Sequence, residues 1–274
     1  MSSSTTNSGH GRVTVSTLME MKANKEKITS LTAYDYSFAQ QIDKAGVDLV
    51  LVGDSLGMVI QGRETTIPVT VDEMIYHARM VGHGLKRALL LVDMPFMSYA
   101  TPELALENGG RLMKETGAQM VKLEGGEDQV ETVSLLVSRN IPVCAHLGLQ
   151  PQSVHRLGGY RVQGRESDVA QQMIADAHAL EQAGASMLVL ECVPVVLAQE
   201  ITAALEIPVI GIGAGVECDG QVLVLYDMLG ITMGRVPQFV KNFMEDGGAV
   251  SEALSNYVAE VRGGKFPAVE HTFQ

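Results

Sequence analysis

The feature that most constrains this chain is a series of short apolar runs along its length, separated by segments with helical patterns. Each run is apolar on both faces, which is typical of a buried parallel strand. The runs cover residues 28–34, 49–53, 88–92, 120–123, 141–146, 187–190, 208–212 and 231–234. Strands and helices are therefore expected to alternate.

Helix start and stop signals lie between several of these runs. Thr70-Val-Asp-Glu73 is a capping box, and Thr101-Pro102 places proline at the first helical position. Ser167 precedes a stretch rich in Ala, Met and Leu that ends at Gly184. Apolar spacing predicts one more helix, over residues 251–261, packed on the outside of the domain.

The number of strand–helix units predicts an α/β fold, a single closed (β/α)8 TIM barrel, which typically needs about 250 residues. An open doubly wound sheet would usually have fewer strands and a Gly-rich fingerprint after the first. No linker-like change in composition interrupts the middle of the 274-residue chain. We predict a disordered tail over residues 1–13 and one catalytic barrel domain over residues 14–274.

Net charge and cysteine content limit which binding partners and which cellular compartment are expected for this chain. A net charge of −12 disfavours nucleic acid and anionic membranes as partners. Three cysteines without a CxxC pair predict neither a disulfide framework nor a zinc site. Residues 1–11 lack the apolar core of a secretory signal, and no apolar run reaches the roughly 20 residues of a membrane span. A soluble protein in the cytoplasm or an organelle matrix is expected, and we predict the cytoplasm.

Polar residues close five of the apolar runs, and in a barrel this is where reactive groups lie. They are Asp54, Asp93, Glu124, His146 and Glu191. Charged groups that are buried together must be paired, protonated or bound to a metal. A few carboxylates with room for waters and substrate oxygens suit Mg²⁺ better than Ca²⁺ or Zn²⁺. The pattern therefore predicts a magnesium site at the barrel mouth.

Plainer interpretations stand beside this one. Any single carboxylate at a strand end can be a helix N-cap or a loop ion pair. His146 is either a ligand or base, or a buried histidine bonded to a backbone carbonyl. Cys192 should face away from Glu191 if the strand continues, so we interpret it as a packing residue. Gly211-Ile-Gly-Ala-Gly215 fits a phosphate-binding turn and close packing equally well.

Ten short motifs together resemble one enzyme family over nearly the whole chain from about residue 14. They are Thr32-Ala-Tyr-Asp35, Val52-Gly-Asp-Ser-Leu-Gly57, Pro68-Val-Thr70, Asp93-Met-Pro-Phe96, Val121-Lys-Leu-Glu-Gly-Gly126, His146-Leu-Gly-Leu149, Gly158-Gly-Tyr160, Leu190-Glu-Cys-Val-Pro194, Gly211-Ile-Gly-Ala-Gly215 and Glu270-His271. The family is ketopantoate hydroxymethyltransferase. The resemblance implies a barrel of the phosphoenolpyruvate/pyruvate-like type and a homodecamer.

The resemblance also assigns a metal site and a substrate. Asp54 and Asp93 match direct Mg²⁺ ligands that lie beside the bound 2-oxo acid, and Glu124 matches the third acidic residue of that site. The implied reaction transfers a hydroxymethyl group from 5,10-methylenetetrahydrofolate to 3-methyl-2-oxobutanoate. It gives 2-dehydropantoate through a Mg-stabilised enolate, the first step of pantothenate and coenzyme A biosynthesis.

The same resemblance places the remaining site residues. Ser55 and Lys122 match residues that contact the 2-oxo acid, and Glu191 matches the catalytic base. Lys122 and Glu124 lie two residues apart and so share one face of their strand, which agrees with a joint position at the mouth.

Two rival functions fit parts of this pattern. Mg²⁺-dependent lyases of the isocitrate lyase or phosphonopyruvate type share the enolate chemistry, but they depend on a reactive cysteine in a mobile loop. The sequence has no Cys-Gly-His-type segment. A catalytically silent barrel that only binds or assembles would not need the metal, substrate and base residues together.

Overall fold

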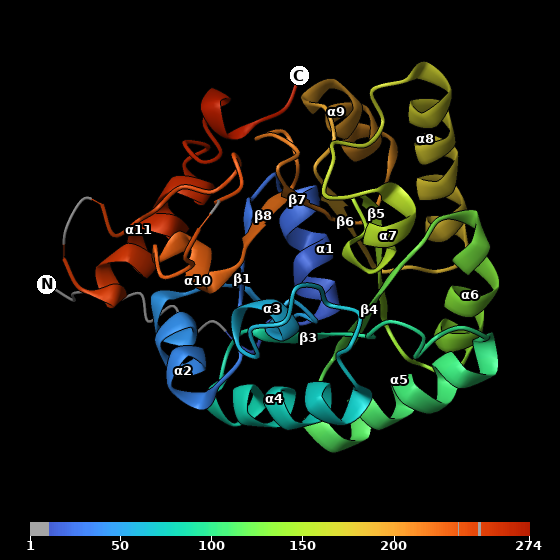
Figure 1. Ribbon diagram of the computed structural model, residues 1–274, viewed down its shortest axis with the longest axis horizontal. Coiled ribbons are helices and arrows are strands. Elements are labelled where there is room, and N and C mark those ends of the chain that lie inside the picture. The colour runs from blue at the N-terminus through green and yellow to red at the C-terminus, as the bar shows by residue number, and fades with distance from the viewer. Residues whose placement is uncertain (1–10, 235, 246–247) are drawn as a thin grey trace, which may run out of the picture.

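The computed structural model describes residues 11–234, 236–245 and 248–274, and its centre is a closed barrel of parallel strands in the order β1 to β8 (Figure 1). The predicted barrel is therefore confirmed. The strands are β1 (Ile28–Thr32), β2 (Leu49–Val52), β3 (Leu89–Asp93), β4 (Met120–Glu124), β5 (Val143–Gly148), β6 (Met187–Glu191), β7 (Val209–Ile212) and β8 (Gly220–Leu223).

Most of the helices surround the strands on the outside of the barrel (Figure 1). The α-helices are α1 (Val15–Ala23), α2 (Tyr36–Ala45), α3 (Leu56–Val59), α4 (Val71–Gly84), α5 (Pro102–Thr116), α6 (Val130–Ser138), α7 (Val154–Leu157), α8 (Ser167–Gln182), α9 (Val195–Ala204), α10 (Leu225–Met228) and α11 (Val250–Arg262). Short 3₁₀ turns are η1 (Glu127–Gln129), η2 (Pro151–Ser153) and η3 (Val269–His271).

The predicted helix signals act as expected. Thr70 caps α4 and forms a reciprocal capping box with Glu73, and Thr101 caps α5 with proline in its first turn. The C-terminal helix α11 packs against α2 and β1. Each cap satisfies a backbone N–H group that would otherwise lack an intrahelical partner.

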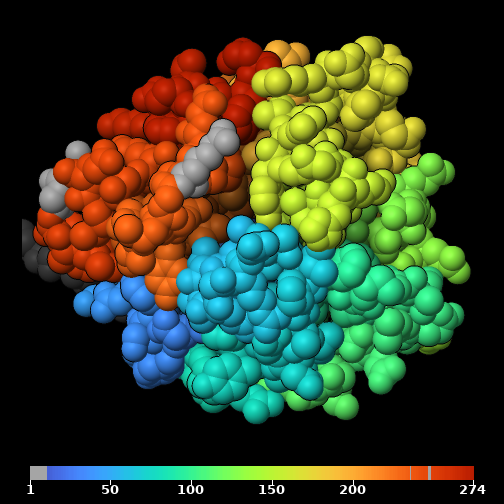
Figure 2. Space-filling view, in the orientation of Figure 1, coloured from blue at the N-terminus to red at the C-terminus, as the bar shows by residue number. Residues whose placement is uncertain are grey.

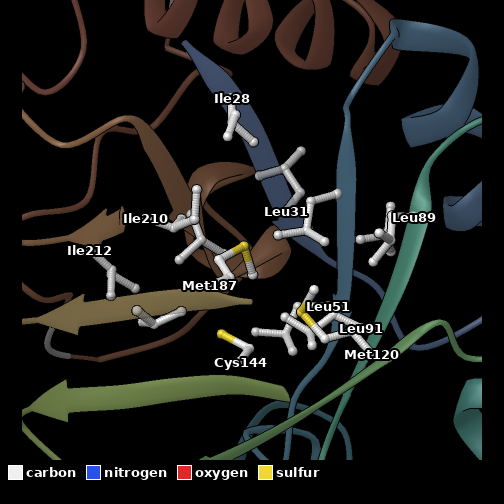
Figure 3. Close-up of a cluster of buried hydrophobic side chains, with 14 of the residues drawn as sticks. Ile28, Leu31, Leu51, Leu89, Leu91, Met120, Cys144, Met187, Ile210 and Ile212 are labelled. Carbon is white, nitrogen blue, oxygen red and sulfur yellow. The ribbon is translucent and has the colours of Figure 1, made fainter. Parts of the chain in front are cut away.

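Apolar side chains fill the inside of the barrel below its mouth. Figure 3 shows a cluster contributed by strands β1 to β7, in which Leu51, Met120 and Met187 are each at most 7% exposed. A filled interior makes this barrel a packed core and not a pore, so the polar groups that end the strands gather at its carboxyl end.

The prediction of a strand over residues 231–234 is wrong. The eighth strand is β8, which pairs with β1 and β7. Its Gly220 is required, because a Cβ atom there would lie 2.4 Å from the carbonyl oxygen of Ile28. Gly220 and Gln221 hide this short strand from a search for apolar runs. In the segment that was expected to be a strand, Met233 is 91% exposed and Gly234 has a left-handed φ of +93°.

Most of the tail predicted over residues 1–13 lies outside the described residues. Within its last part Val13 is buried, and its N–H donates to the carbonyl of Arg87. No helix in the described ranges is long and apolar enough to cross a membrane. All three cysteines are free and buried.

Candidate active site

A cavity of about 1080 Å³ opens at the carboxyl end of the barrel, and the ends of β2 to β6 supply part of its polar lining. Figure 2 shows this face, where the segment after β2 (cyan), the segment after β5 (yellow) and the segment after β8 (orange) meet. All the residues selected at the sequence level line this cavity: Asp54, Ser55, Asp93, Lys122, Glu124, His146 and Glu191. Barrel closure therefore brings them together, as predicted.

Asp54 and Asp93 lie next to each other at the ends of neighbouring strands. The backbone N–H of Asp54 donates to Asp93 Oδ2 at 3.1 Å. Gly53 makes this approach possible, since a Cβ atom there would lie 2.8 Å from Ser55 Oγ and 3.4 Å from Asp93 Oδ2. Burial and then the charges of Asp93 and Glu124 raise the pKa of Asp54 well above its usual value.

Lys122 places a buried positive charge among these carboxylates. Its Nζ lies 2.7 Å from Asp93 Oδ1. Burial alone would lower the pKa of Lys122, but Asp93, Glu124 and Asp54 raise it above its ordinary value, so the ammonium stays charged. The side chain can therefore hold an anionic group that enters the cavity.

His146 connects two further carboxylates. Its Nδ1 lies 3.6 Å from Glu124 Oε1, and its Nε2 lies 3.3 Å from Glu191 Oε2. Burial and Lys122 lower the pKa of His146, yet the neighbouring carboxylates of Glu124 and Glu191 outweigh them and raise it to about 9. Within the described residues, the His146 ring contacts Glu124, Glu191 and Lys122 and no backbone carbonyl. The interpretation of His146 as a buried histidine bonded to a backbone carbonyl therefore does not hold.

Gln152 is a buried residue of the site that the sequence did not single out. Its Nε2 donates to Asp54 Oδ2 at 2.8 Å and to the Met94 carbonyl at 3.0 Å, while its backbone N–H donates to Glu124 Oε2. Tyr99 in turn donates to Gln152 Oε1. One residue in η2 thus holds carboxylates from two strand ends, Asp54 through its side chain and Glu124 through its backbone N–H, and neither period nor charge marks it in the sequence.

Tyr34 is a second functional residue that strand-end reasoning missed. Its hydroxyl lies 2.9 Å from Ser55 Oγ, and either atom can be the donor. Ser55 starts the short helix α3 directly after Asp54. The Thr32-Ala-Tyr-Asp35 motif was a signal for this position, but it named no role for the tyrosine.

Among the residues that the structure describes, no group of three or more His, Cys, Asp or Glu side chains is arranged to hold a metal ion alone. The charge balance nevertheless favours a cation. At the strand ends that line the cavity, Asp54, Asp93, Glu124 and Glu191 face two positive groups, Lys122 and a protonated His146. A divalent ion that takes few protein ligands, and completes its shell with substrate and water oxygens, fits this donor set.

The glycine run after β7 serves close packing. A Cβ at Gly213 would lie 2.9 Å from Phe239 and 3.0 Å from Phe273, and one at Gly215 would lie 3.0 Å from Val195. Gly213 and Gly215 also have left-handed φ angles, which suit glycine. These contacts favour the packing interpretation over a phosphate-binding turn.

Cys192 does not turn away from the site as expected. Strand β6 ends at Glu191, and Cys192 adopts a left-handed φ of 49° and lines the cavity. Burial and the charge of Glu191 raise the pKa of its thiol, which therefore stays protonated and is a poor nucleophile. Its buried position still agrees with a packing role.

A family model described as ketopantoate hydroxymethyltransferase matches residues 12–269. The chain belongs to this family. The 3-methyl-2-oxobutanoate hydroxymethyltransferase of Alkalilimnicola ehrlichii is 62% identical, over 95% of this chain and 94% of that protein. The enzyme of the same name from Halorhodospira halophila is 58% identical, over 96% of each chain. The chain is therefore an enzyme, a hydroxymethyltransferase.

Solved structures show where else this fold occurs. Phosphonopyruvate hydrolase superposes with a TM-score of 0.62 at 12% identity, covering 92% of this chain and 95% of that one. The lyase described as 2,3-dimethylmalate lyase, a member of the PEP mutase/isocitrate lyase superfamily, gives a TM-score of 0.59 at 17% identity, covering 79% and 82%. At these identities the likeness shows the fold alone, which is the predicted closed (β/α)8 barrel.

Proposed function

We propose that this hydroxymethyltransferase takes its one-carbon unit from 5,10-methylenetetrahydrofolate and adds it to 3-methyl-2-oxobutanoate in a Mg²⁺-dependent reaction. The oxo acid, the folate and one water give 2-dehydropantoate and tetrahydrofolate. The observation that carries this proposal is the convergence of Asp54, Asp93, Lys122 and Glu191 on one cavity of a chain that belongs to the family.

Asp54 and Asp93 would hold the Mg²⁺, with Glu124 beside them. Their carboxylates are adjacent and buried, and the raised pKa of Asp54 reflects negative charge that a cation would relieve. When bound, Mg²⁺ supplies positive charge next to the carboxylate and ketone oxygens of a 2-oxo acid.

The protein's own residues would do the remaining chemistry. The Lys122 ammonium holds an oxygen of the substrate, and the Ser55 hydroxyl, fixed by Tyr34, contacts the same molecule. Glu191 takes the proton from C3 of the oxo acid, and the electron pair left on the enolate forms the new bond to the one-carbon unit. The two C–N bonds that join this carbon to the folate break, water supplies the hydroxyl group, and tetrahydrofolate leaves. His146, 3.3 Å from Glu191, orients that base.

Three wider parts of the proposal rest on family membership. We place the reaction at the first step of pantothenate and coenzyme A biosynthesis, and the enzyme in the cytoplasm as a homodecamer. Light scattering on the purified protein would test the assembly, and a mass near that of one 29.4 kDa chain would contradict it.

The decisive experiment measures 2-dehydropantoate formation from both substrates, first with Mg²⁺ and then with excess chelator. We expect product with Mg²⁺ and its loss on chelation, restored when Mg²⁺ is added back. Full activity in the chelator would remove the metal from the proposal. No product from folded protein under either condition would overturn the choice of substrates.

A further inference from the structure

Asp227 is a buried carboxylate that the proposed chemistry does not use. It lies in α10 directly after β8, is 9% exposed and lines the same cavity as the catalytic residues. Its Oδ1 accepts a hydrogen bond from the Thr232 hydroxyl. Within the described residues this is the one hydrogen bond of the Asp227 side chain, so the carboxylate retains capacity to accept more.

Tyr34 is a buried side chain outside the cavity lining that lies close to Asp227 and to Ser55. Burial raises the pKa of the Tyr34 hydroxyl, and the charges of Asp227 and Asp93 raise it further, so both acids lie close to this side chain. The same hydroxyl bonds to Ser55 beside the proposed metal site. Because Asp227 and Asp54 line the same cavity, a ligand held at Asp227 would have its other end near the reacting oxo acid.

The wall around Asp227 is apolar and aromatic. Tyr226 stacks on Tyr34 with ring centroids 5.9 Å apart and planes 20° apart. Ile231, Phe239 and Phe273 line the same side of the cavity. At about 1080 Å³ the cavity matches the upper end of ligand sites that hold drug-sized molecules, and is far larger than a five-carbon oxo acid needs. A second, larger and flatter ligand fits the remaining space.

We propose that Asp227 binds the pterin ring of the folate co-substrate, accepting hydrogen bonds from the adjacent ring N–H and amino group of its aminopyrimidone edge. This inference rests on the proposed function, because the folate donor is itself proposed. A carboxylate presents two acceptors side by side, which match two neighbouring N–H donors, and such charge-assisted pairs are strong and directional. The apolar wall packs against the ring faces.

The electrostatics of Asp227 agree with this role. Burial raises the pKa of Asp227, and the Thr232 hydrogen bond opposes that rise. Two more donors from a ligand would favour the ionised carboxylate. The alternative is that Asp227 has only a structural role, in which its hydrogen bond with Thr232 holds the segment after α10 in place. The experiment must distinguish ligand binding from this structural role.

The test compares Asp227→Asn with the wild type in two assays. Asparagine keeps an oxygen for Thr232 but places an amide group against the donors of the pterin. We expect the KM for 5,10-methylenetetrahydrofolate to rise about tenfold or more, while exchange of the C3 proton in D₂O without folate stays within about threefold. Asp168→Asn makes the same chemical change at an exposed acid of α8 that does not line the cavity, and its folate KM should match that of the wild type.

A second variant addresses the structural alternative. Thr232→Val removes the hydrogen bond within the segment but keeps the carboxylate, so its folate KM should rise much less than that of Asp227→Asn. The proposal would be overturned if the folate KM rose equally in both variants, or if it did not change in Asp227→Asn. It would also be overturned if Asp227→Asn lost folate affinity and C3 proton exchange in parallel. Absence of folate-dependent turnover in the wild type itself would instead overturn the proposed function, and the subsite with it.

Discussion

The cavity of this enzyme has two sides that differ in how they are held in place. On one side, the ends of β2 to β6 carry Asp54, Asp93, Lys122, Glu124 and Glu191, which contact one another through ion pairs, His146 and the hydrogen bonds of Gln152. On the other side, β7, β8 and the segments after them present Ile212, Val222, Ile231, Phe239 and Phe273. Fixed charges define the first side, and mainly apolar surface around the buried carboxylate of Asp227 defines the second.

The two sides of the cavity suit two different functions, the chemical step and the binding of a large co-substrate. Buried charges are costly to displace and stabilise developing charge without reorganising, so the polar side suits the chemical step. Apolar surface contributes in proportion to the area removed from water, so the other side suits binding of a large co-substrate. Substitutions on the polar side should therefore change rates and stability, and those on the apolar side should change mainly one KM.

The largest effect is expected at the base. Glu191→Gln should lower the rate of C3 proton exchange of 3-methyl-2-oxobutanoate in D₂O by about 10²–10⁴-fold, because general-base catalysis typically contributes that much. Binding of the oxo acid should persist, since glutamine keeps the shape of the side chain. Glu200→Gln on α9, an exposed acid of the same unit, is the matched control. Normal exchange in Glu191→Gln would remove this residue from its role.

The next largest effect is expected when the buried positive charge of Lys122 is removed. Lys122→Met leaves Asp54, Asp93 and Glu124 without their positive neighbour, and we expect a loss of about 3–5 kcal/mol in the free energy of unfolding when metal is chelated. Mg²⁺ should restore part of this loss, because an ion that binds only the folded state stabilises it. Urea unfolding with and without Mg²⁺ measures both effects.

The exposed Lys86→Met is the control for that change, with an expected shift of less than about 0.5 kcal/mol. A destabilised Lys122→Met protein that Mg²⁺ does not stabilise would show that Lys122 supports the fold and that no metal compensates these carboxylates.

A pH dependence follows from His146. Its pKa rises from 6.5 to about 9 in the folded protein, so its stabilisation is fully present below about pH 6.5 and is lost as the pH rises through about 9. In chelated protein this loss should be on the order of 3 kcal/mol, at 1.36 kcal/mol per pKa unit. His146→Gln should flatten the profile in this window, and the exposed His83→Gln should not. An unchanged slope in His146→Gln would exclude this residue as the cause.

A smaller loss is expected when the network that joins the polar groups is cut. Gln152→Leu leaves Asp54 Oδ2 and the Met94 carbonyl without their donor and Tyr99 without its acceptor. Buried groups left unsatisfied in this way cost about 1–3 kcal/mol in the free energy of unfolding. Gln150→Leu, in the same turn but partly exposed, is the matched control. Equal stability of the two variants would mean that Gln152 does not hold the site.

The strand-end residues of the polar side could be predicted from the sequence, and the apolar side could not. Asp54, Asp93, Glu124, His146 and Glu191 each close an apolar run, and barrel closure is enough to bring strand ends together. The metal-site roles of these residues remain predictions. These residues could be predicted because the signal lies within a few neighbouring positions of the sequence. A strand that is buried on both faces is an unbroken apolar run, and the polar residue that ends it stands directly beside that run.

The elements that were missed depend on contacts far apart in the chain. Strand β8 begins with Gly220 because the Ile28 carbonyl lies against it, which no apolar pattern reveals. Gln152 follows β5 but bonds to Asp54, a residue 98 positions away. Asp227 joins the cavity only because β8 precedes it, so the misplaced eighth strand also concealed this carboxylate.

The smallest effect is expected on the apolar side, and it tests the comparison most directly. Ile231 is 51% exposed and lines the cavity, whereas Val196 is 73% exposed and lies outside the lining. Ile231→Ser should weaken binding of the folate by about 1 kcal/mol, or roughly fivefold in KM, by removing apolar area that the ligand would cover. Proton exchange at C3 and the melting temperature should stay as in the wild type, and Val196→Ser should change none of the three. A loss of proton exchange in Ile231→Ser would mean that this wall also shapes the chemical site, and the two sides of the cavity would then not be separate in function.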